Sequence, residues 1–367
     1  MAPTPFTAVY RRTLIATVIG LAITGVFGFH HPDYFFQSYL FVYEYFSAIV
    51  FGSLGFLLLY LLVGGKWGRP IRRILAATVS TVPWTSVLFI PILIGMTKIY
   101  PWATVADPKT LGAHKMIWYG HGFFIGRSIF YLIVLNILAF YALRKIRYEL
   151  AHSEPAAKSK DVGAIGFLVF FVLLSFAVFD WTMSLEPHWY SSIYGALVLS
   201  EYGLSMLAFS IIILNWLSRL YPEKHAVDPE ASLDLGNLLL ATTMFWTYMS
   251  ISQYIIIWSG NLPEEISWYI ARRDGGWRAF TTVVFGGQFA YSFAILLGME
   301  RKRALQRLAR IAWWVMAIRV LDTFWMVTPD YHPGKIVLHW TDLGLFLAMG
   351  GIWLTIFFGR LKKEAAV

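Results

Sequence analysis

The chain is dominated by long apolar runs, each about the length that an α-helix needs to cross a bilayer. About 20 mainly apolar residues span the hydrocarbon layer, and lipid offers no partners to backbone N–H and C=O groups, so each run must be helical. With 58% apolar residues, the sequence predicts an all-α integral membrane protein with a single membrane domain, 1–367. About ten transmembrane helices are expected, at 13–29, 35–64, 72–97, 116–144, 162–185, 189–218, 232–259, 276–299, 307–328 and 336–360.

The charged residues lie mostly in the short loops between these runs, although the formal net charge is +9. This distribution favours a topology signal over a nucleic-acid surface. The face that holds both termini carries about three times as many Lys and Arg residues as the other face. Both termini are therefore expected in the cytoplasm. The run after Arg11 and Arg12 lacks a clear cleavage site, so the first helix is expected to be retained.

Cysteine is absent from the sequence, which excludes disulfides, thiolate metal ligands and iron–sulfur ligation by this chain. A membrane haem usually needs histidines on facing helices, and only His121 falls clearly within an expected span. No metal site and no covalently bound cofactor are therefore expected. Haems or clusters would have to belong to partner subunits.

An internal similarity divides the chain. HPDYFFQSY at 31–39 resembles EPHWYSSIY at 186–194, with Pro32 over Pro187. Extended along the chain, this offset predicts two similar four-helix bundles, 35–185 and 189–328, followed by a final helix at 336–360. Four helices separate the halves, so they should share one membrane direction. Alternatively, aromatic turns with proline recur at the outer membrane boundary without any repeat.

Several charged or titratable residues fall inside the expected spans, where each needs a structural or functional reason. All of them lie between the middle of the membrane and the outer surface, which favours an outward-facing polar chamber. They are Glu44, His121, Arg127, Asp180, Glu201, Arg319 and Asp322, with His339 and Asp342 close to the boundary. Arg319 and Asp322 are three residues apart on one helix, so simple structural pairing is an alternative for them.

Three segments carry a family resemblance: FDWTMSLEPHWYSSIYG at 179–195, SQYIIIWSGNLPEEI at 252–266 and FWMVTPDYHP at 324–333. With the ten-helix layout, they resemble the NrfD-like membrane subunits of bacterial alternative complex III, and the last two segments resemble the smaller, ActF type. The resemblance implies a multi-pass subunit of the bacterial cytoplasmic (inner) membrane. It also implies a quinol:cytochrome c type oxidoreductase in which the larger NrfD-like subunit, an iron–sulfur subunit and multihaem cytochrome subunits are partners, with lipid and quinone.

A quinol site needs polar groups for the hydroxyl protons and an aromatic slot for the ring. We expect Asp180 and His121 to transfer protons toward the outer side, with Arg127 holding nearby carboxylates ionised. Glu44, Arg127, Glu201, Arg319 and Asp322 are expected in a quinone site or a proton path. The first bundle contains Asp180, His121, Glu44 and Arg127, so it is favoured if one bundle holds the site.

Two other functions stay open. The chain can be a structural scaffold of the complex, because the larger NrfD-like subunit can carry the reaction. A secondary transporter is the other alternative, but it predicts an inverted repeat and broken helices at mid-membrane, neither of which the sequence suggests.

Overall fold

The structure is a computed structural model that describes residues 5–28, 31–104, 113–152 and 157–366. Within these ranges all regular secondary structure is helical. Nine helices of the described chain are long and apolar enough to cross a membrane, which confirms a multi-pass membrane protein. The tenth expected span, 232–259, forms the continuous helix α12 (Pro229–Gly260), which is long enough but less apolar than the nine.

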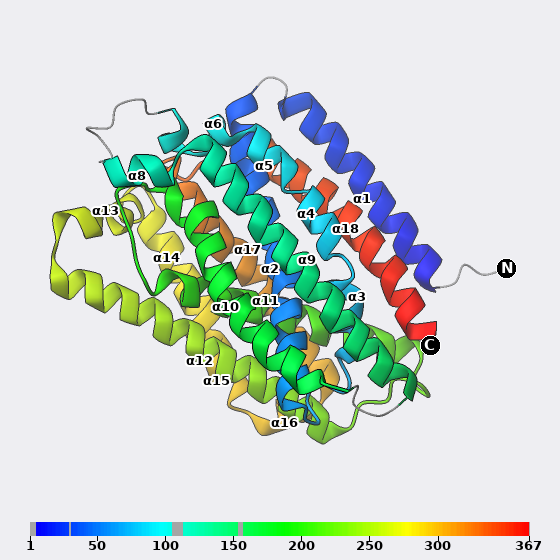
Figure 1. Ribbon diagram of the computed structural model, residues 1–367. Coiled ribbons are helices and arrows are strands. Elements are labelled where there is room, and N and C mark those ends of the chain that lie inside the picture. The colour runs from blue at the N-terminus through cyan, green and yellow to red at the C-terminus, as the bar shows by residue number, and fades with distance from the viewer. Residues whose placement is uncertain (1–4, 29–30, 105–112, 153–156, 367) are drawn as a thin grey trace.

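The long helices lie roughly along one common axis (Figure 1). Besides α12 they are α1 (Pro5–Gly28), α2 (Pro32–Val63), α9 (His121–His152), α10 (Ser159–Trp181), α11 (Tyr194–Leu220), α17 (Leu305–Val327) and α18 (Trp340–Ala366). Short helices cap one end of the bundle, α8 (Ala113–Trp118) and α13 (Pro263–Ala271) among them. The turns are η1 (Pro101–Ala103), η2 (Met183–Leu185) and η4 (Thr328–Asp330).

The expected helix at 72–97 is interrupted rather than continuous. It consists of α3 (Arg72–Val79), α4 (Val82–Val87), α5 (Ile90–Ile94) and α6 (Met96–Ile99). Pro83 and Pro91 fall in the first turns of α4 and α5. Proline lacks a backbone N–H and clashes with the preceding turn, so the breaks lie just before these residues.

The expected helix at 276–299 is also irregular. It begins as α14 (Trp277–Phe285), widens into the π-helical segment η3 (Gly286–Tyr291) and ends as α15 (Ser292–Leu296). The separate short helix α16 (Met299–Arg303) leads into α17. Single π-helical turns inside α-helices often mark functional sites.

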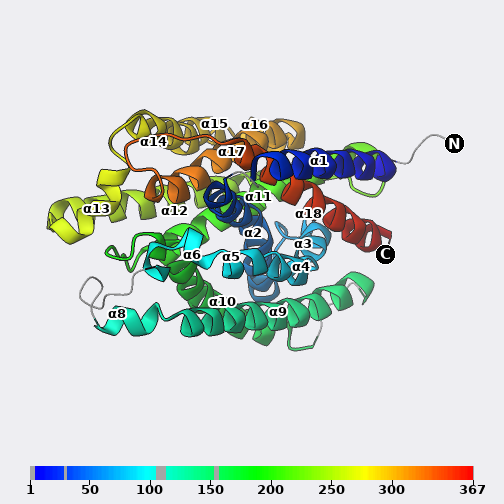
Figure 2. The ribbon, with the colours of Figure 1, turned by 90° about the horizontal axis from the view of Figure 1, so that it is seen from above.

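Helices α2 and α11 form the centre of the molecule. In the apolar stretch of α11, 94% of the residues are buried inside the protein, whereas in that of α1 only 17% are. A helix that is apolar all round must be covered by protein or lipid, so α11 belongs to the core and α1 presents its side chains to lipid. Figure 2 shows α9 on one side of this centre and α14 and α15 on the opposite side.

Two groups of helices meet at the α2–α11 contact. On one side α2 packs against α3, α9 and α10; on the other, α11 packs against α12 and α17, with α14 beside α17. Helix α18 packs along α1 and α2. These neighbours are compatible with two four-helix bundles, 35–185 and 189–328. Their internal repeat and common direction stay predictions.

Candidate functional site: a lined cavity beside buried charge clusters

Asp180, in the last turn of α10, is fully buried and accepts four hydrogen bonds. Arg127 donates to both carboxylate oxygens, through Nε to Oδ2 at 2.8 Å and Nη2 to Oδ1 at 2.9 Å. Trp118 Nε1 adds a bond to Oδ1 at 3.0 Å, and the Tyr131 hydroxyl adds one to Oδ2 at 2.9 Å. A carboxylate has about four acceptor sites, so this one is saturated by the protein itself.

Arg127 is held as firmly as its partner. Its guanidinium lies 4.0 Å from the Trp118 ring centroid and 4.4 Å from that of Phe123, and Nη1 donates to the Trp118 carbonyl at 2.9 Å. Two-point pairing with a carboxylate and stacking on aromatic rings both favour arginine in a fixed orientation. The Arg127–Asp180 pair therefore ties α8, α9 and α10 together.

His121 and Glu44 lie outside this cluster. His121 was expected inside a span, but α9 begins at this residue, and its side chain is exposed. Its Nε2 lies 2.9 Å from the Ala103 carbonyl oxygen, and because a carbonyl only accepts, Nε2 carries the proton. Glu44 lies at the α2–α11 contact, where Tyr202 donates to Oε1 at 2.5 Å. Of the four residues favoured in the first bundle, only Arg127 and Asp180 are joined directly.

A second buried cluster brings together the other three predicted residues. Arg319 Nη2 lies 3.0 Å from Glu201 Oε2 on α11, and Nη1 donates to Asp322 Oδ2 one turn further along α17. Arg319 Nε donates to Ser205 Oγ at 3.3 Å. Pairing of Arg319 with Asp322 was expected, whereas the contact with Glu201 depends on how α11 packs against α17. The cluster holds two carboxylates and one guanidinium, so one added proton makes it neutral.

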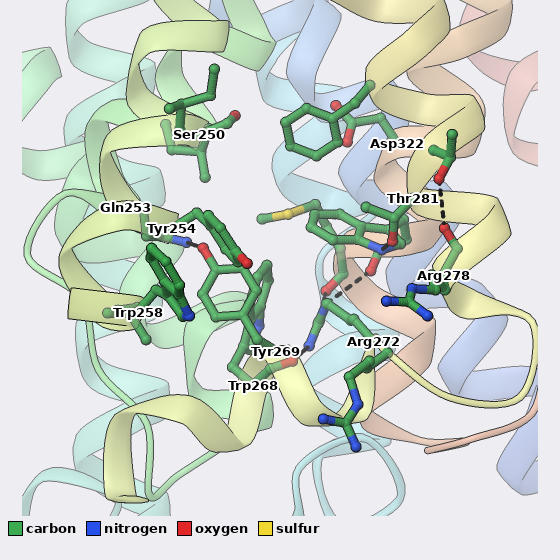
Figure 3. A pocket seen from close by; sticks show the side chains of 18 of the residues that line it. Ser250, Gln253, Tyr254, Trp258, Trp268, Tyr269, Arg272, Arg278, Thr281 and Asp322 are labelled. Atoms are coloured by element: carbon green, nitrogen blue, oxygen red, sulfur yellow. Dashed lines mark hydrogen bonds between the residues drawn. The ribbon is translucent and has the colours of Figure 1, made fainter. Parts of the chain in front are cut away.

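A cavity of 610 Å³ adjoins this second cluster. It is lined by residues of α11, α12, α13, α14 and α17, and its lining includes Glu201 and Asp322. Figure 3 shows Ser250 and Asp322 at one end of the cavity and Trp268 and Arg272 at the other. The sequence favoured the first bundle for a site, whereas this cavity lies among the helices of the second.

Aromatic side chains form much of the cavity wall, among them Trp246, Tyr254, Trp258, Trp268, Tyr269, Phe285 and Trp325. The Tyr269 hydroxyl on α13 is one polar atom of this wall that a neighbouring helix holds. Gln253 donates through Nε2 to the Tyr269 hydroxyl at 3.3 Å and accepts from Ser191 at 3.1 Å. Burial raises the pKa of the Tyr269 phenol to about 12, so this hydroxyl keeps its proton at neutral pH.

Arg272 is the residue of this region that sequence reasoning missed, because it was counted among the charges of an outer loop. Its side chain is 1% exposed, pairs with Asp330 through two bonds of 2.9 Å and lies 3.6 Å from the Trp268 ring centroid. It also donates to the carbonyls of Trp268, Trp325 and Met326. Trp268 and Arg272 are four residues apart, which places both on one helix face. This spacing is the sequence feature from which their contact could have been predicted.

Two buried polar atoms of the cavity-lining residues have no hydrogen-bond partner within the described part of the chain. They are Trp246 Nε1, a donor, and Asp322 Oδ1, an acceptor. Buried polar groups in proteins are nearly always paired, so these lining residues leave one donor and one acceptor unused among the described residues.

No protein-family model matches the sequence, and no curated protein matches it either. Within the described ranges, no group of three or more His, Asp or Glu residues is placed to hold a metal ion.

Proposed function

We propose that the chain is a membrane subunit of a quinol:electron-acceptor oxidoreductase of the cytochrome c type, and that the cavity beside Asp322 holds the quinol ring. Ligand pockets of about 300–1,000 Å³ with apolar and aromatic walls and a few placed polar groups are typical of small-molecule sites. A cavity of 610 Å³ fits this range. The proposal agrees with the resemblance to NrfD-like subunits in three segments of the sequence.

The observation that carries the proposal is that the carboxylate-bearing Asp322 lines a cavity whose wall is largely aromatic. Asp322 lines the cavity and keeps Oδ1 free of partners among the described residues, while Oδ2 is held by Arg319. A quinol hydroxyl would donate to Oδ1, and a quinol oxygen would accept from Trp246 Nε1. Both orphaned atoms would then be satisfied by one ring.

In the proposed step, quinol becomes quinone as its two O–H bonds break and two protons and two electrons leave. One proton passes to Asp322 or Glu201, which makes the cluster with Arg319 neutral. The other leaves for water at the open side of the cavity. Both electrons would pass to a redox centre held by a partner subunit, since this chain has no cysteine to hold an iron–sulfur cluster of its own.

Asp180 receives a structural role in this proposal. All four of its acceptor sites are occupied by Arg127, Trp118 and Tyr131, so it cannot accept a quinol proton without losing one of these bonds. We therefore assign the proton step to Asp322 and Glu201. Glu44, whose Oε2 also lacks a partner among the described residues, would extend the path toward the α2–α11 contact.

The assembly around the subunit follows from the resemblance. We infer a bacterial cytoplasmic membrane, both termini in the cytoplasm, and a complex with the larger NrfD-like subunit, an iron–sulfur subunit and multihaem cytochrome subunits. The strong bias of Lys and Arg toward one set of loops supports the orientation.

The test is quinol oxidation by the complex that co-purifies with the chain, using a short-tail naphthoquinol. Asp322→Asn leaves the Arg319–Glu201 pair intact and electrically neutral, so the complex should assemble. Turnover should fall about a hundredfold, as expected when a positioned proton acceptor is lost. Glu223→Gln, at an exposed carboxylate in the turn between α11 and α12, is the control and should keep full turnover.

A second measurement, of quinone binding, distinguishes a quinone-binding subunit from a purely structural one. The naphthoquinone should quench the tryptophan fluorescence of the cavity, and Gln253→Leu or Trp246→Phe should weaken that binding. An assembled Asp322→Asn complex with normal turnover and normal quinone binding would identify the chain as a scaffold instead.

A further inference from the structure

A groove of 620 Å³ lies between α9 and α10, at the end of the molecule away from α8 and α13. This end also carries the C-terminus, because Arg147 near the end of α9 pairs with Glu364 near the end of α18 at 2.7 Å. The groove shares no lining residue with the cavity beside Asp322. It is therefore separate from the proposed quinol site.

The mouth of the groove is basic. Arg144, Lys145 and Lys158 line it together with one carboxylate, Asp161, so the described lining residues carry two positive charges more than negative ones at neutral pH. Lys145 donates to the Ala157 carbonyl. Arg144 and Lys158 are exposed, and they make no hydrogen bond or ion pair with other residues of the described chain. Among the described residues, both charges are left without an ion-pair partner.

The rest of the groove is apolar and continues along the two helices. Leu138, Val162 and Ile165 form the wall, with Ile165 66% exposed. Further along α10, Leu168 also presents a large apolar side chain outward. Tyr141 lies one turn from Arg144 on the side of the apolar wall, and Tyr148 lies one turn beyond Arg144 on the other side. Tyrosine at such a transition is typical of the membrane–water interface.

We propose that this groove binds a phospholipid with an anionic headgroup. Its phosphate would contact Arg144 and Lys158, while an acyl chain would lie along Leu138 and Ile165. Basic pockets between transmembrane helices are suited to anionic headgroups, and each Lys or Arg adds to the attraction. A soluble anion would leave the apolar wall unused, and a zwitterionic lipid would leave the excess positive charge unmatched.

The experiment titrates the purified, delipidated full chain in detergent with phosphatidylglycerol or with phosphatidylcholine of the same acyl chains, and counts bound lipid by native mass spectrometry. One phosphatidylglycerol should bind at least tenfold more tightly than phosphatidylcholine. Arg144→Gln with Lys158→Gln should weaken phosphatidylglycerol binding about thirtyfold, since two charges are removed. The matched control, Lys362→Gln with Lys363→Gln, removes two exposed charges near the end of α18 and should bind within twofold of wild type.

Two further measurements identify the ligand and test the groove with a different variant. Glycerol phosphate should not displace the lipid at equal concentration, because it lacks the acyl chain; displacement would make this a free phosphate site and overturn the proposal. Ile165→Glu changes the exposed wall without touching the basic mouth and should also weaken binding. Equal binding of the two lipids, or normal binding by the Arg144, Lys158 variant, would overturn the proposal as well.

Discussion

Three buried or half-buried arginines organise the polar interior, and each pairs with at least one carboxylate. Arg127 pairs with Asp180, Arg272 with Asp330, and Arg319 with both Glu201 and Asp322. Breaking such a pair by removing one partner is costly because the other charge stays buried. The two carboxylates differ in their number of partners: Asp180 is saturated, whereas Asp322 Oδ1 has no partner among the described residues.

Asp180→Asn should therefore lower stability rather than act first on turnover. It removes the charge that Arg127 faces, and about 3 kcal/mol of stability should be lost. Thermal unfolding of the purified protein in detergent measures this, with exposed Glu223→Gln as the control. If the variant had unchanged stability and a shifted pH profile of turnover, Asp180 would instead be a proton-transfer residue, as expected from the sequence.

His332 lies in the connection before α18, and its environment predicts that the stability of the fold depends on pH. Burial lowers the pKa of its imidazole from the ordinary 6.5, with the Asp342 carboxylate partly opposing the shift. The ring stacks on Tyr34 with 5.4 Å between ring centroids. The unfolded chain then binds the proton more readily than the folded one. This residue's contribution is thus complete above about pH 6.5 and is lost as the pH falls below it.

The melting temperature should accordingly drop between pH 7.5 and pH 5.5. His332→Gln should reduce that drop, and exposed His188→Gln should not. An equal pH slope in the His332→Gln protein would rule out this origin.

At the scale of the elements, the close approach of α2 to α11 decides how the two groups of helices meet. Gly52 faces α11 so closely that a Cβ atom there would lie 2.3 Å from the Tyr202 carbonyl oxygen. Backbone cannot yield as a side chain can, so only glycine fits at this contact. The same contact brings the Tyr202 hydroxyl to Glu44.

Gly52→Ala should push α2 and α11 apart and cost about 1–3 kcal/mol of stability, as overpacking does. Gly126→Ala is the matched control in α9, because a Cβ there meets nothing within 4 Å. That change should be neutral or gain up to about 1 kcal/mol from helix propensity. Thermal unfolding of both variants checks the difference, and equal stabilities would show that the α2–α11 contact tolerates a methyl group.

At the scale of the whole molecule, the charge bias predicts the orientation in the membrane. Reporter fusions after Arg147 and after Val367 should read cytoplasmic, and a fusion after Asn261 should read external. The Arg147–Glu364 ion pair places the ends of α9 and α18 together, so the first two fusions must agree. An external C-terminus would reverse the orientation and with it the side to which the cavity beside Asp322 opens.

The sequence by itself determined the all-helical membrane class, because runs of about 20 apolar residues in lipid have no alternative to a helix. It also singled out the charged residues inside spans, since each is costly there. The Arg319–Asp322 pair was predictable from a spacing of three residues on one helix. Such inferences concern one segment at a time.

Tertiary structure alone decided which charges meet and where space remains. Glu201 joins Arg319 because α11 packs against α17, Arg127 meets Asp180 because α9 lies beside α10, and His121 stays apart because α9 begins at that residue. Residues far apart in the chain become neighbours through packing of whole helix faces, which no single segment encodes. For the same reason the cavity beside Asp322 lies among α11, α12, α13, α14 and α17, while a second, mainly apolar hollow of 730 Å³ lies between α9 and the α4–α5 segment of the first group.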